Sequence, residues 1–289
     1  MDKLFFGKKV VVVTPAGRRQ YLDILFKYIV HLKPAITEYR LWVNTKDEQD
    51  IECMRKFQRD NSDFVTLEFL DKDAQNSFSN TAKEYSICKF YKNCCDPDSV
   101  YIRFDDDIVA MGDIHSFQEF IKFRIEHPQY FLVYANILNN ALTSYLHQRN
   151  GLFDTDRGIC WYECIDRIGW KSGPFAEMLH STVLANPDLN LYKMKNWNLF
   201  HYERMSVNGV SWLGDEFAKF AGLVDKDEEE FISCIKPRDV QKKNIIFGGF
   251  VCVHYAFYTQ RPHVDKNPSI LKSYAKLAEK LAEKLAETP

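Results

Sequence analysis

Three consecutive carboxylates follow an apolar stretch in the middle of the chain, in the sequence Tyr101-Ile-Arg-Phe-Asp-Asp-Asp-Ile-Val109. Neighbouring carboxylates repel one another and oppose folding unless cations lie among them. Mg²⁺ and Mn²⁺ take oxygen ligands, often one or two carboxylates with substrate phosphate and water. Residues 105–107 therefore predict a site for Mn²⁺ or Mg²⁺. The alternative is an acidic turn or a helix cap, although a cap needs one Asp rather than three.

The elements that would position these acids alternate along the chain. An uninterrupted β-branched run, typical of a strand buried on both faces, is followed by a break at Pro15-Ala16-Gly17 and then by apolar residues at helical spacing. We expect strands at 8–14, 39–44, 64–70, 99–109, 130–134, 199–205 and 245–253, and helices at 18–32, 77–91, 115–126, 139–148 and from 215. The region 151–187 is expected to be rich in loops, and a turn is expected at 208–209. This alternation predicts an α/β fold.

Composition excludes several classes of protein. Among 289 residues, 38 Lys and Arg nearly balance 40 Asp and Glu, so no global positive field would hold nucleic acid. No run approaches the ~20 apolar residues of a membrane-spanning helix. The eight cysteines lack paired C-x-x-C spacing, which favours reduced thiols and a cytoplasmic protein.

The Lys-Leu-Ala-Glu repeat after residue 271 predicts a helical tail at 273–289 beyond a domain at 1–272, and a solubilising role is favoured over partner binding.

The strand that ends in Asp-x-Asp resembles that of the GT-A class of nucleotide-sugar glycosyltransferases. The chain is most similar to cytoplasmic glycosyltransferases of bacteria and of large algal viruses such as the chlorella viruses. The segments that carry the resemblance are TPAGR (14–18), LWVNT (41–45), YIRFDDDIV (101–109), VNGVSWLGDEF (207–217) and VHYAFYTQR (253–261). The resemblance covers nearly the whole chain and implies one GT-A-like domain, with a Rossmann-type, mostly parallel sheet flanked by helices.

The resemblance also implies roles for the matched residues. Asp107 would bind the metal that bridges the donor diphosphate, Asp105 would act through the metal shell or the ribose, and Asp106 would face the ribose. Arg103 has the same side-chain parity as Asp105 and would either reach the donor or form a structural ion pair. The nucleotide would lie along Thr14, Pro15, Ala16, Gly17 and Arg18, with Asn44 near the base.

A histidine late in the chain would be a further metal ligand or diphosphate contact in this pattern. His254 fits best because it directly follows a predicted strand, and His263 is the second choice. Tyr258 and Arg261 could hold phosphate oxygens. A general base is also needed, and Asp215 or Glu216 is expected to supply it. Asp215 could instead cap a helix, and both roles could hold at once.

The function expected from these residues is metal-dependent transfer of a sugar from a nucleotide-diphospho-sugar, with a UDP-sugar as the default donor. The acceptor would be the hydroxyl of a glycan or glycoprotein, and the reaction would invert the anomeric centre. If the viral likeness holds, the product would be a capsid or surface glycan made in the host-cell cytoplasm. The alternatives are a metal-dependent phosphoryl- or pyrophosphate-transfer enzyme and a non-catalytic carbohydrate-binding protein.

Overall fold

The β-branched run near the N-terminus forms strand β1 (Lys9–Ala16) at the centre of a parallel arrangement. It pairs in parallel with β2 (Glu38–Val43) on one side and with β4 (Ser99–Phe104) on the other. All four residues of 10–13 are buried, and alternate side chains enter two separate hydrophobic clusters, one on each face of the sheet. The expected strand buried on both faces is therefore confirmed.

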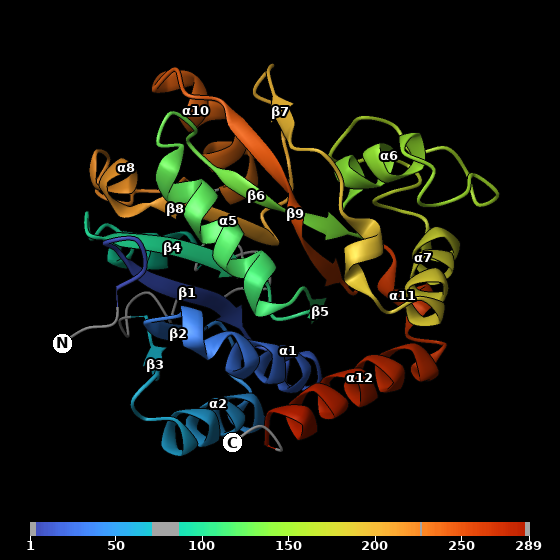
Figure 1. The fold of residues 1–289 in the computed structure, drawn as a ribbon, viewed down its shortest axis with the longest axis horizontal. Coiled ribbons are helices and arrows are strands. Elements are labelled where there is room, and N and C mark those ends of the chain that lie inside the picture. Colours follow the sequence, from blue (N-terminus) through green and yellow to red (C-terminus); the bar gives the residue numbers. More distant parts are fainter. Residues whose placement is uncertain (1–3, 71–86, 226, 287–289) are drawn as a thin grey trace.

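The computed structural model describes residues 4–70, 87–225 and 227–286, and in these residues nine strands form one sheet (Figure 1). The order is β3-β2-β1-β4-β8-β6-β9-β5, with β7 paired to β9. The remaining strands are β3 (Val65–Glu68), β5 (Ile108–Met111), β6 (Val133–Leu138), β7 (Trp197–Leu199), β8 (Gly209–Leu213) and β9 (Asn244–His254). The pairings among β1 to β4 and between β6 and β9 are parallel, while β8 is antiparallel to both of its neighbours. The α/β prediction, with a sheet flanked by helices, is confirmed.

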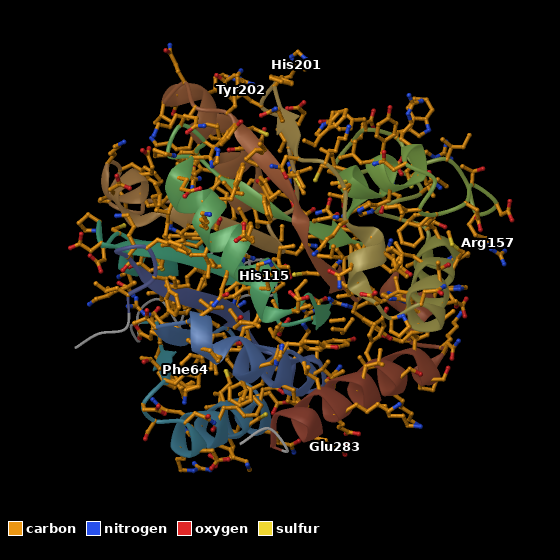
Figure 2. All side chains as sticks on the ribbon, in the orientation of Figure 1. Phe64, His115, Arg157, His201, Tyr202 and Glu283 are labelled. Atoms are coloured by element: carbon orange, nitrogen blue, oxygen red, sulfur yellow. The ribbon has the colours of Figure 1, made fainter. Side chains whose placement is uncertain are left out.

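Helices cover both faces of this sheet, and side chains fill the space between the layers (Figure 2). The longer helices are α1 (Arg19–Leu32), α2 (Glu48–Asp60), α5 (Ile114–Glu126), α6 (Ala141–Arg149), α7 (Gly173–Ala185) and α12 (Pro268–Ala286). The short ones are α8 (Gly214–Ala218), α9 (Glu228–Glu230), α10 (Lys236–Asp239), α11 (Arg261–Val264), η1 (Lys33–Ala35), η2 (Lys89–Asn93), η3 (Leu189–Tyr192) and η4 (Phe231–Ile235). None of the described helices is both long enough and apolar enough to cross a membrane.

The helix expected at the C-terminal end is α12, and it is packed more closely than a solubilising tail would be. Figure 1 shows α12 running alongside α1. Tyr274 and Ala278 are fully buried in the same cluster as the apolar face of α1. The hydroxyl of Tyr274 also donates to Nδ1 of His180 on α7, at 3.0 Å. One face of α12 thus belongs to the core of the α/β body.

Several local predictions differ from the structure. The strand expected at 99–109 is two strands, β4 and β5, because the chain turns at residues 105–107. The region 151–187 contains α7, because Ser172 caps its first turn through the backbone N–H of Phe175 and Pro174 suits the first turn. The strand expected at 199–205 ends at Leu199. The helix expected at 77–91 lies mostly outside the described residues, and only its last part can be compared, where η2 is a 3₁₀ helix.

Candidate active site

A cavity of about 660 Å³ opens at the carboxyl end of β4, where the three acids leave the sheet. Its walls come from the acidic turn, from residues 204–208 before β8, from residues 227–229, and from residues 254–261 after β9. Open α/β sheets commonly bind ligands at the carboxyl ends of their strands, and this volume lies within the range of small-molecule sites. The cavity is therefore the candidate active site.

The first acid of the triplet, Asp105, faces the cavity and is held by Arg103. Nε and Nη2 of Arg103 donate to Oδ1 of Asp105 at 3.1 and 2.8 Å. The same guanidinium pairs with Glu228 of α9 and donates to the hydroxyl of Tyr91 at 2.8 Å. Arg103 is 3% exposed. Of the two roles expected for it, the structural ion pair is the one that the structure contains.

The second acid, Asp106, is buried and joins the turn after β1 to the turn after β4. Its carboxylate accepts from the backbone N–H of Gly17 at 3.0 Å and from Nε of Arg18 at 2.9 Å. Asp106 does not line the cavity, so it is not placed to face a ribose there. Its contacts instead fix Arg18, which does line the cavity. Burial raises the pKa of Asp106 more than Arg18 lowers it.

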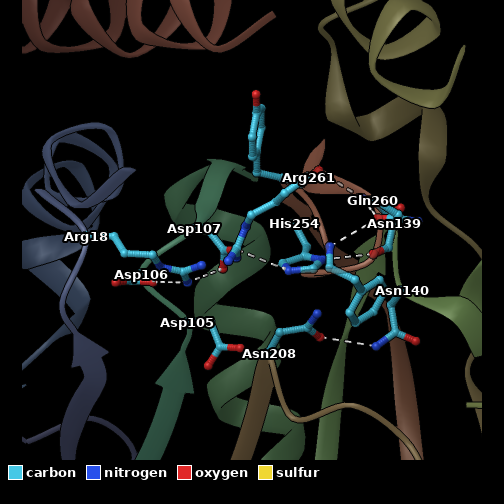
Figure 3. A network of polar contacts seen from close by, with 12 residues as sticks. Arg18, Asp105, Asp106, Asp107, Asn139, Asn140, Asn208, His254, Gln260 and Arg261 are labelled. Carbon is cyan, nitrogen blue, oxygen red and sulfur yellow. Dashed lines mark hydrogen bonds and ion pairs between the residues drawn. The ribbon is translucent and has the colours of Figure 1, made fainter. Parts of the chain in front are cut away.

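The third acid, Asp107, lies among three basic side chains (Figure 3). Nη2 of Arg18 is 3.2 Å from Oδ1, Nη2 of Arg261 is 2.5 Å from Oδ2, and Nε2 of His254 is 3.4 Å from Oδ2. Burial raises the pKa of Asp107, but the positive charges of Arg18 and His254 outweigh it and lower that pKa to about 2. Asp107 is therefore ionised at neutral pH and is surrounded by groups that can also bind phosphate.

His254 is oriented by a single backbone contact. Its Nδ1–H donates to the carbonyl oxygen of Asn139 at 2.9 Å, which leaves Nε2 directed at Asp107. Burial lowers the pKa of His254, but Asp107 and this hydrogen bond raise it, and the net pKa lies above its usual value. His263 lies elsewhere, where Nε2 is 2.8 Å from Glu177 on α7. Of the two expected histidines, only His254 lines the cavity.

With His254 in its neutral form, Asp107 and His254 could supply two ligands to a divalent cation. Two neighbouring ligands of Mg²⁺ at ~2.1 Å are about 3 Å apart, close to the 3.4 Å between Oδ2 of Asp107 and Nε2 of His254. Oδ1 of Asp107 accepts no hydrogen bond in the described part of the chain. No three His, Cys, Asp or Glu side chains are grouped to hold a metal in residues 4–70, 87–225 and 227–286. The other ligands would therefore be phosphate oxygens and water.

The opposite wall is acidic and contains groups that the sequence did not reveal. Glu229 accepts from Nε of Arg204 at 2.7 Å and from Sγ of Cys164 at 3.2 Å. Asp227 pairs with the same guanidinium at 3.1 Å. Asn208, expected only to form a turn, is 2% exposed and lines the cavity beside them. The sequence signal that could have identified this wall is the run of acids at 227–230, which lies far along the chain from the metal motif.

Aromatic side chains form the mouth of the cavity. The rings of Trp170 and Tyr258 meet edge to face, with centroids 5.2 Å apart. The carbonyl of Trp170 accepts from the hydroxyl of Thr259, and the carbonyl of Gly169 accepts from Nε2 of Gln260 at 3.1 Å. These bonds join the loop before α7 to the segment after β9. Tyr258 is 69% exposed, so it presents a ring surface to solvent at the entrance.

Several residues expected along the nucleotide are not brought to this cavity. Thr14 is fully buried and accepts from the hydroxyl of Tyr39 at 3.1 Å, and Pro15 and Ala16 are also buried within β1. Asn44 is bonded through its backbone N–H to Ala16 and does not line the cavity. These positions differ from the expectation because β1 continues to Ala16, two residues beyond the predicted end of the strand. Of the segment 14–18, only Arg18 lines the cavity.

The residues expected to act as the general base lie at the opposite end of β4. Strand β8 runs antiparallel to β4 and pairs Gly209 with Phe104 and Leu213 with Val100. Helix α8, which carries Asp215 and Glu216, therefore begins near the start of β4, and Figure 1 shows it far from α11. Asp215 is exposed, while Glu216 is buried and pairs with Lys219 and Lys242. The expectation that either residue shares a site with residues 105–107 is corrected.

Comparisons with known proteins are weak. No protein-family model matches the chain, and no curated protein sequence matches it. Mannose-6-phosphate isomerase from Helicobacter pylori is similar at 16% identity and a TM-score of 0.33, over 46% of this chain and 54% of that chain. Mannose-1-phosphate geranyltransferase from Thermus thermophilus is similar at 9% identity and a TM-score of 0.38, over 86% of this chain and 76% of that chain. This chain spans about half the length of the isomerase.

Proposed function

We propose that this chain is a metal-dependent glycosyltransferase that uses a nucleotide-diphospho-sugar, with a UDP-sugar as the first donor to test. The observation that carries this proposal is the position of Asp107 in the cavity, in contact with Arg18, Arg261 and His254. A carboxylate next to an imidazole provides ligands for Mn²⁺ or Mg²⁺, and two guanidinium groups provide donors for phosphate oxygens. A diphosphate is a ligand whose oxygens can contact both the metal ion and the guanidinium groups.

The donor diphosphate would occupy the basic side of the cavity. Arg18 and Arg261 would donate to its oxygens, and Asp107 and His254 would hold the ion. A bound divalent ion supplies positive charge where the diphosphate leaves. Asp106 keeps Arg18 in place by accepting two hydrogen bonds from that side chain and one from the backbone N–H of Gly17. These residues would bind and orient the donor before any bond breaks.

The acceptor hydroxyl would lose its proton to the acidic wall rather than to α8. Asp227, Glu228 and Glu229 all line the cavity, whereas Asp215 and Glu216 do not. Glu228 forms an ion pair with Arg103, and burial raises the pKa of Glu228 despite that contact. Glu229 has one oxygen on Arg204 and belongs to a short helix at the wall. We therefore assign the general base to Glu229.

A carbohydrate acceptor suits the mouth of the cavity. Sugar rings have apolar faces that pack on aromatic side chains and hydroxyl edges that need polar partners. Trp170 and Tyr258 offer the aromatic surface, and the neutral and acidic groups of the opposite wall offer the polar partners. The glycan or glycoprotein acceptor expected from the sequence is consistent with this division.

The test is donor binding followed by turnover. Wild-type protein should bind UDP and at least one UDP-sugar by calorimetry with MnCl₂ present, and EDTA should weaken that binding. It should also hydrolyse the bound UDP-sugar slowly to UDP and free sugar, as detected by ¹H NMR, which follows the anomeric signal as well. Release of inorganic phosphate without free sugar would support a phosphoryl-transfer enzyme instead. Binding of free glycans without nucleotide binding would support a carbohydrate-binding protein.

A further inference from the structure

Asn208 carries a hydrogen-bond donor that the described residues do not use. Its Oδ1 accepts from Nδ2 of Asn140 at 3.1 Å, which fixes the orientation of the amide. Its Nδ2 is buried and has no hydrogen-bond partner among the described residues, and Asn208 itself lines the cavity. Figure 3 shows that nitrogen turned away from Asn140. A buried donor without a partner is unfavourable, so a ligand atom that accepts from it would recover this loss.

An unused acceptor lies beside this donor. The last pairing between β4 and β8 joins Phe104 to Gly209, so Asp105 and Asn208 are the next pair across the two strands. The backbone N–H of Asp105 donates to the carbonyl of Asn208 at 3.3 Å, which confirms that they are adjacent. Arg103 donates twice to Oδ1 of Asp105, while Oδ2 accepts no bond from the described residues. An unpartnered amide N–H and a carboxylate oxygen that accepts no bond from the described residues thus belong to neighbouring residues that both line the cavity.

The chemistry of the surroundings selects a neutral, hydroxylated ligand here. Asp227, Glu228 and Glu229 line the same side of the cavity, and Arg103 and Arg204 are already engaged with them. Their negative charge would repel a phosphate group. A hydroxyl group both donates and accepts, so it satisfies a carboxylate and an amide N–H at once. Phosphate oxygens would go to the basic side instead, at Arg18 and Arg261.

We propose that Asn208 and Asp105 bind a hydroxyl of the sugar that the donor transfers, with Nδ2 of Asn208 donating to the hydroxyl oxygen and Oδ2 of Asp105 accepting from its O–H. This inference rests on the proposed function and adds the residues that select the sugar. Asn140 is a positioning residue, because its amide also donates to the carbonyl of Ser206 and so holds the strand end that carries Asn208.

The experiment compares UDP with UDP-glucose and UDP-galactose by calorimetry in MnCl₂, for wild type and Asn208→Asp. The variant keeps an acceptor for Asn140 but replaces the free donor with a second carboxylate beside Asp105. We expect the affinity for the UDP-sugar that wild type binds to fall about tenfold or more, and the affinity for UDP to change less than about twofold. Asn190→Asp makes the same charge change at an exposed position and should alter neither affinity.

Each result decides between the two proposals. Unchanged affinity of Asn208→Asp for the UDP-sugar overturns the inference, and an equal loss for UDP and UDP-sugar overturns it in favour of a contact with the nucleotide. If wild type binds neither UDP nor a UDP-sugar, the proposed function fails and the inference fails with it. Thermal unfolding by circular dichroism checks that Asn208→Asp is folded. If it is not, Asn208→Ser removes the amide without adding charge and should show the same selective loss.

Discussion

Nε2 of His254 lies 3.4 Å from Oδ2 of Asp107 because β9 ends where the antiparallel strand β5 begins. Strand β5 pairs with β9 so that Ile108 is opposite His254. Asp107 is the residue immediately before Ile108, and the backbone N–H of Tyr255 donates to its carbonyl at 2.9 Å. The metal-binding pair proposed here is thus set by strand register, and neither side chain needs a flexible loop to reach the other.

Removing the carboxylate of Asp107 should abolish metal-dependent donor binding. In Asp107→Asn, the amide would be a poor ligand for Mn²⁺ and would no longer attract Arg18 and Arg261. We expect UDP binding in MnCl₂ to weaken at least about tenfold, with no further effect of EDTA. The comparison is Asp106→Asn, which should lower the melting temperature and weaken donor binding through Arg18 without removing its dependence on the metal, because Gly17 and Arg18 lose a charged acceptor. Metal-dependent binding that survives in Asp107→Asn would contradict this assignment.

Replacing the proposed base should separate transfer from donor binding. Glu229→Gln keeps the size of the side chain and an acceptor for Arg204 but removes the proton acceptor. We expect transfer to fall by about 10²–10⁴-fold, while donor affinity changes little. Asp215→Asn should leave transfer near the wild-type rate, because Asp215 is exposed at the other end of β4. If steady-state kinetics instead show that Asp215→Asn loses transfer and Glu229→Gln keeps it, the general base lies on α8.

Two buried histidines should make the fold less stable in acid. Burial lowers the pKa of His147 to about 3 and that of His180 to about 4, below the 6.5 of an exposed histidine. At a pH between the folded-state pKa of each histidine and 6.5, the unfolded chain binds protons that the folded chain does not. The free energy of unfolding therefore falls as the pH drops below about 6.5. Each histidine contributes about 1.4 kcal/mol per pH unit in this window.

This pH dependence can be measured by urea unfolding at about pH 7 and about pH 5. His147→Gln can still donate to Oδ1 of Asn136, which Nε2 of His147 contacts at 2.6 Å, but it does not titrate. It should lose less stability than wild type between the two pH values. His201 is exposed after β7 (Figure 2), so His201→Gln should behave as wild type does. An identical loss in all three proteins would rule out His147 as a source.

A charge placed between α1 and α12 should destabilise the whole fold. Ala278 of α12 is fully buried in the cluster that also contains the apolar face of α1, so Ala278→Glu would bury a carboxylate without a partner and cost about 3 kcal/mol or more. Lys276→Glu introduces the same side chain at an exposed position of the same helix and should change the melting temperature little. If Ala278→Glu melts like wild type, α12 is not part of the cooperative unit.

The sequence was sufficient for the features that local pattern determines. The β-branched run predicted β1, and four of the predicted site residues, Asp105, Asp107, His254 and Arg261, line one cavity. It was not sufficient where long-range register decides the outcome. Asp215 follows a turn and an aromatic strand as a catalytic residue could, but the antiparallel pairing of β8 with β4 takes it to the wrong end of the sheet. Asn208 is informative only because its amide nitrogen is buried without a partner among the described residues, which no local pattern encodes.

The consecutive residues Asn139 and Asn140 each hold one wall of the cavity. Asn139, with a φ of 61°, donates through its amide to the carbonyl of Tyr255, and Asn140 donates to the carbonyl of Ser206. Adjacent Cα atoms are always about 3.8 Å apart. The two walls are therefore linked through adjacent residues, and this link sets the distance between them. We expect that inserting or deleting a residue here would change the length of substrate that fits, without changing the side chains that line either wall.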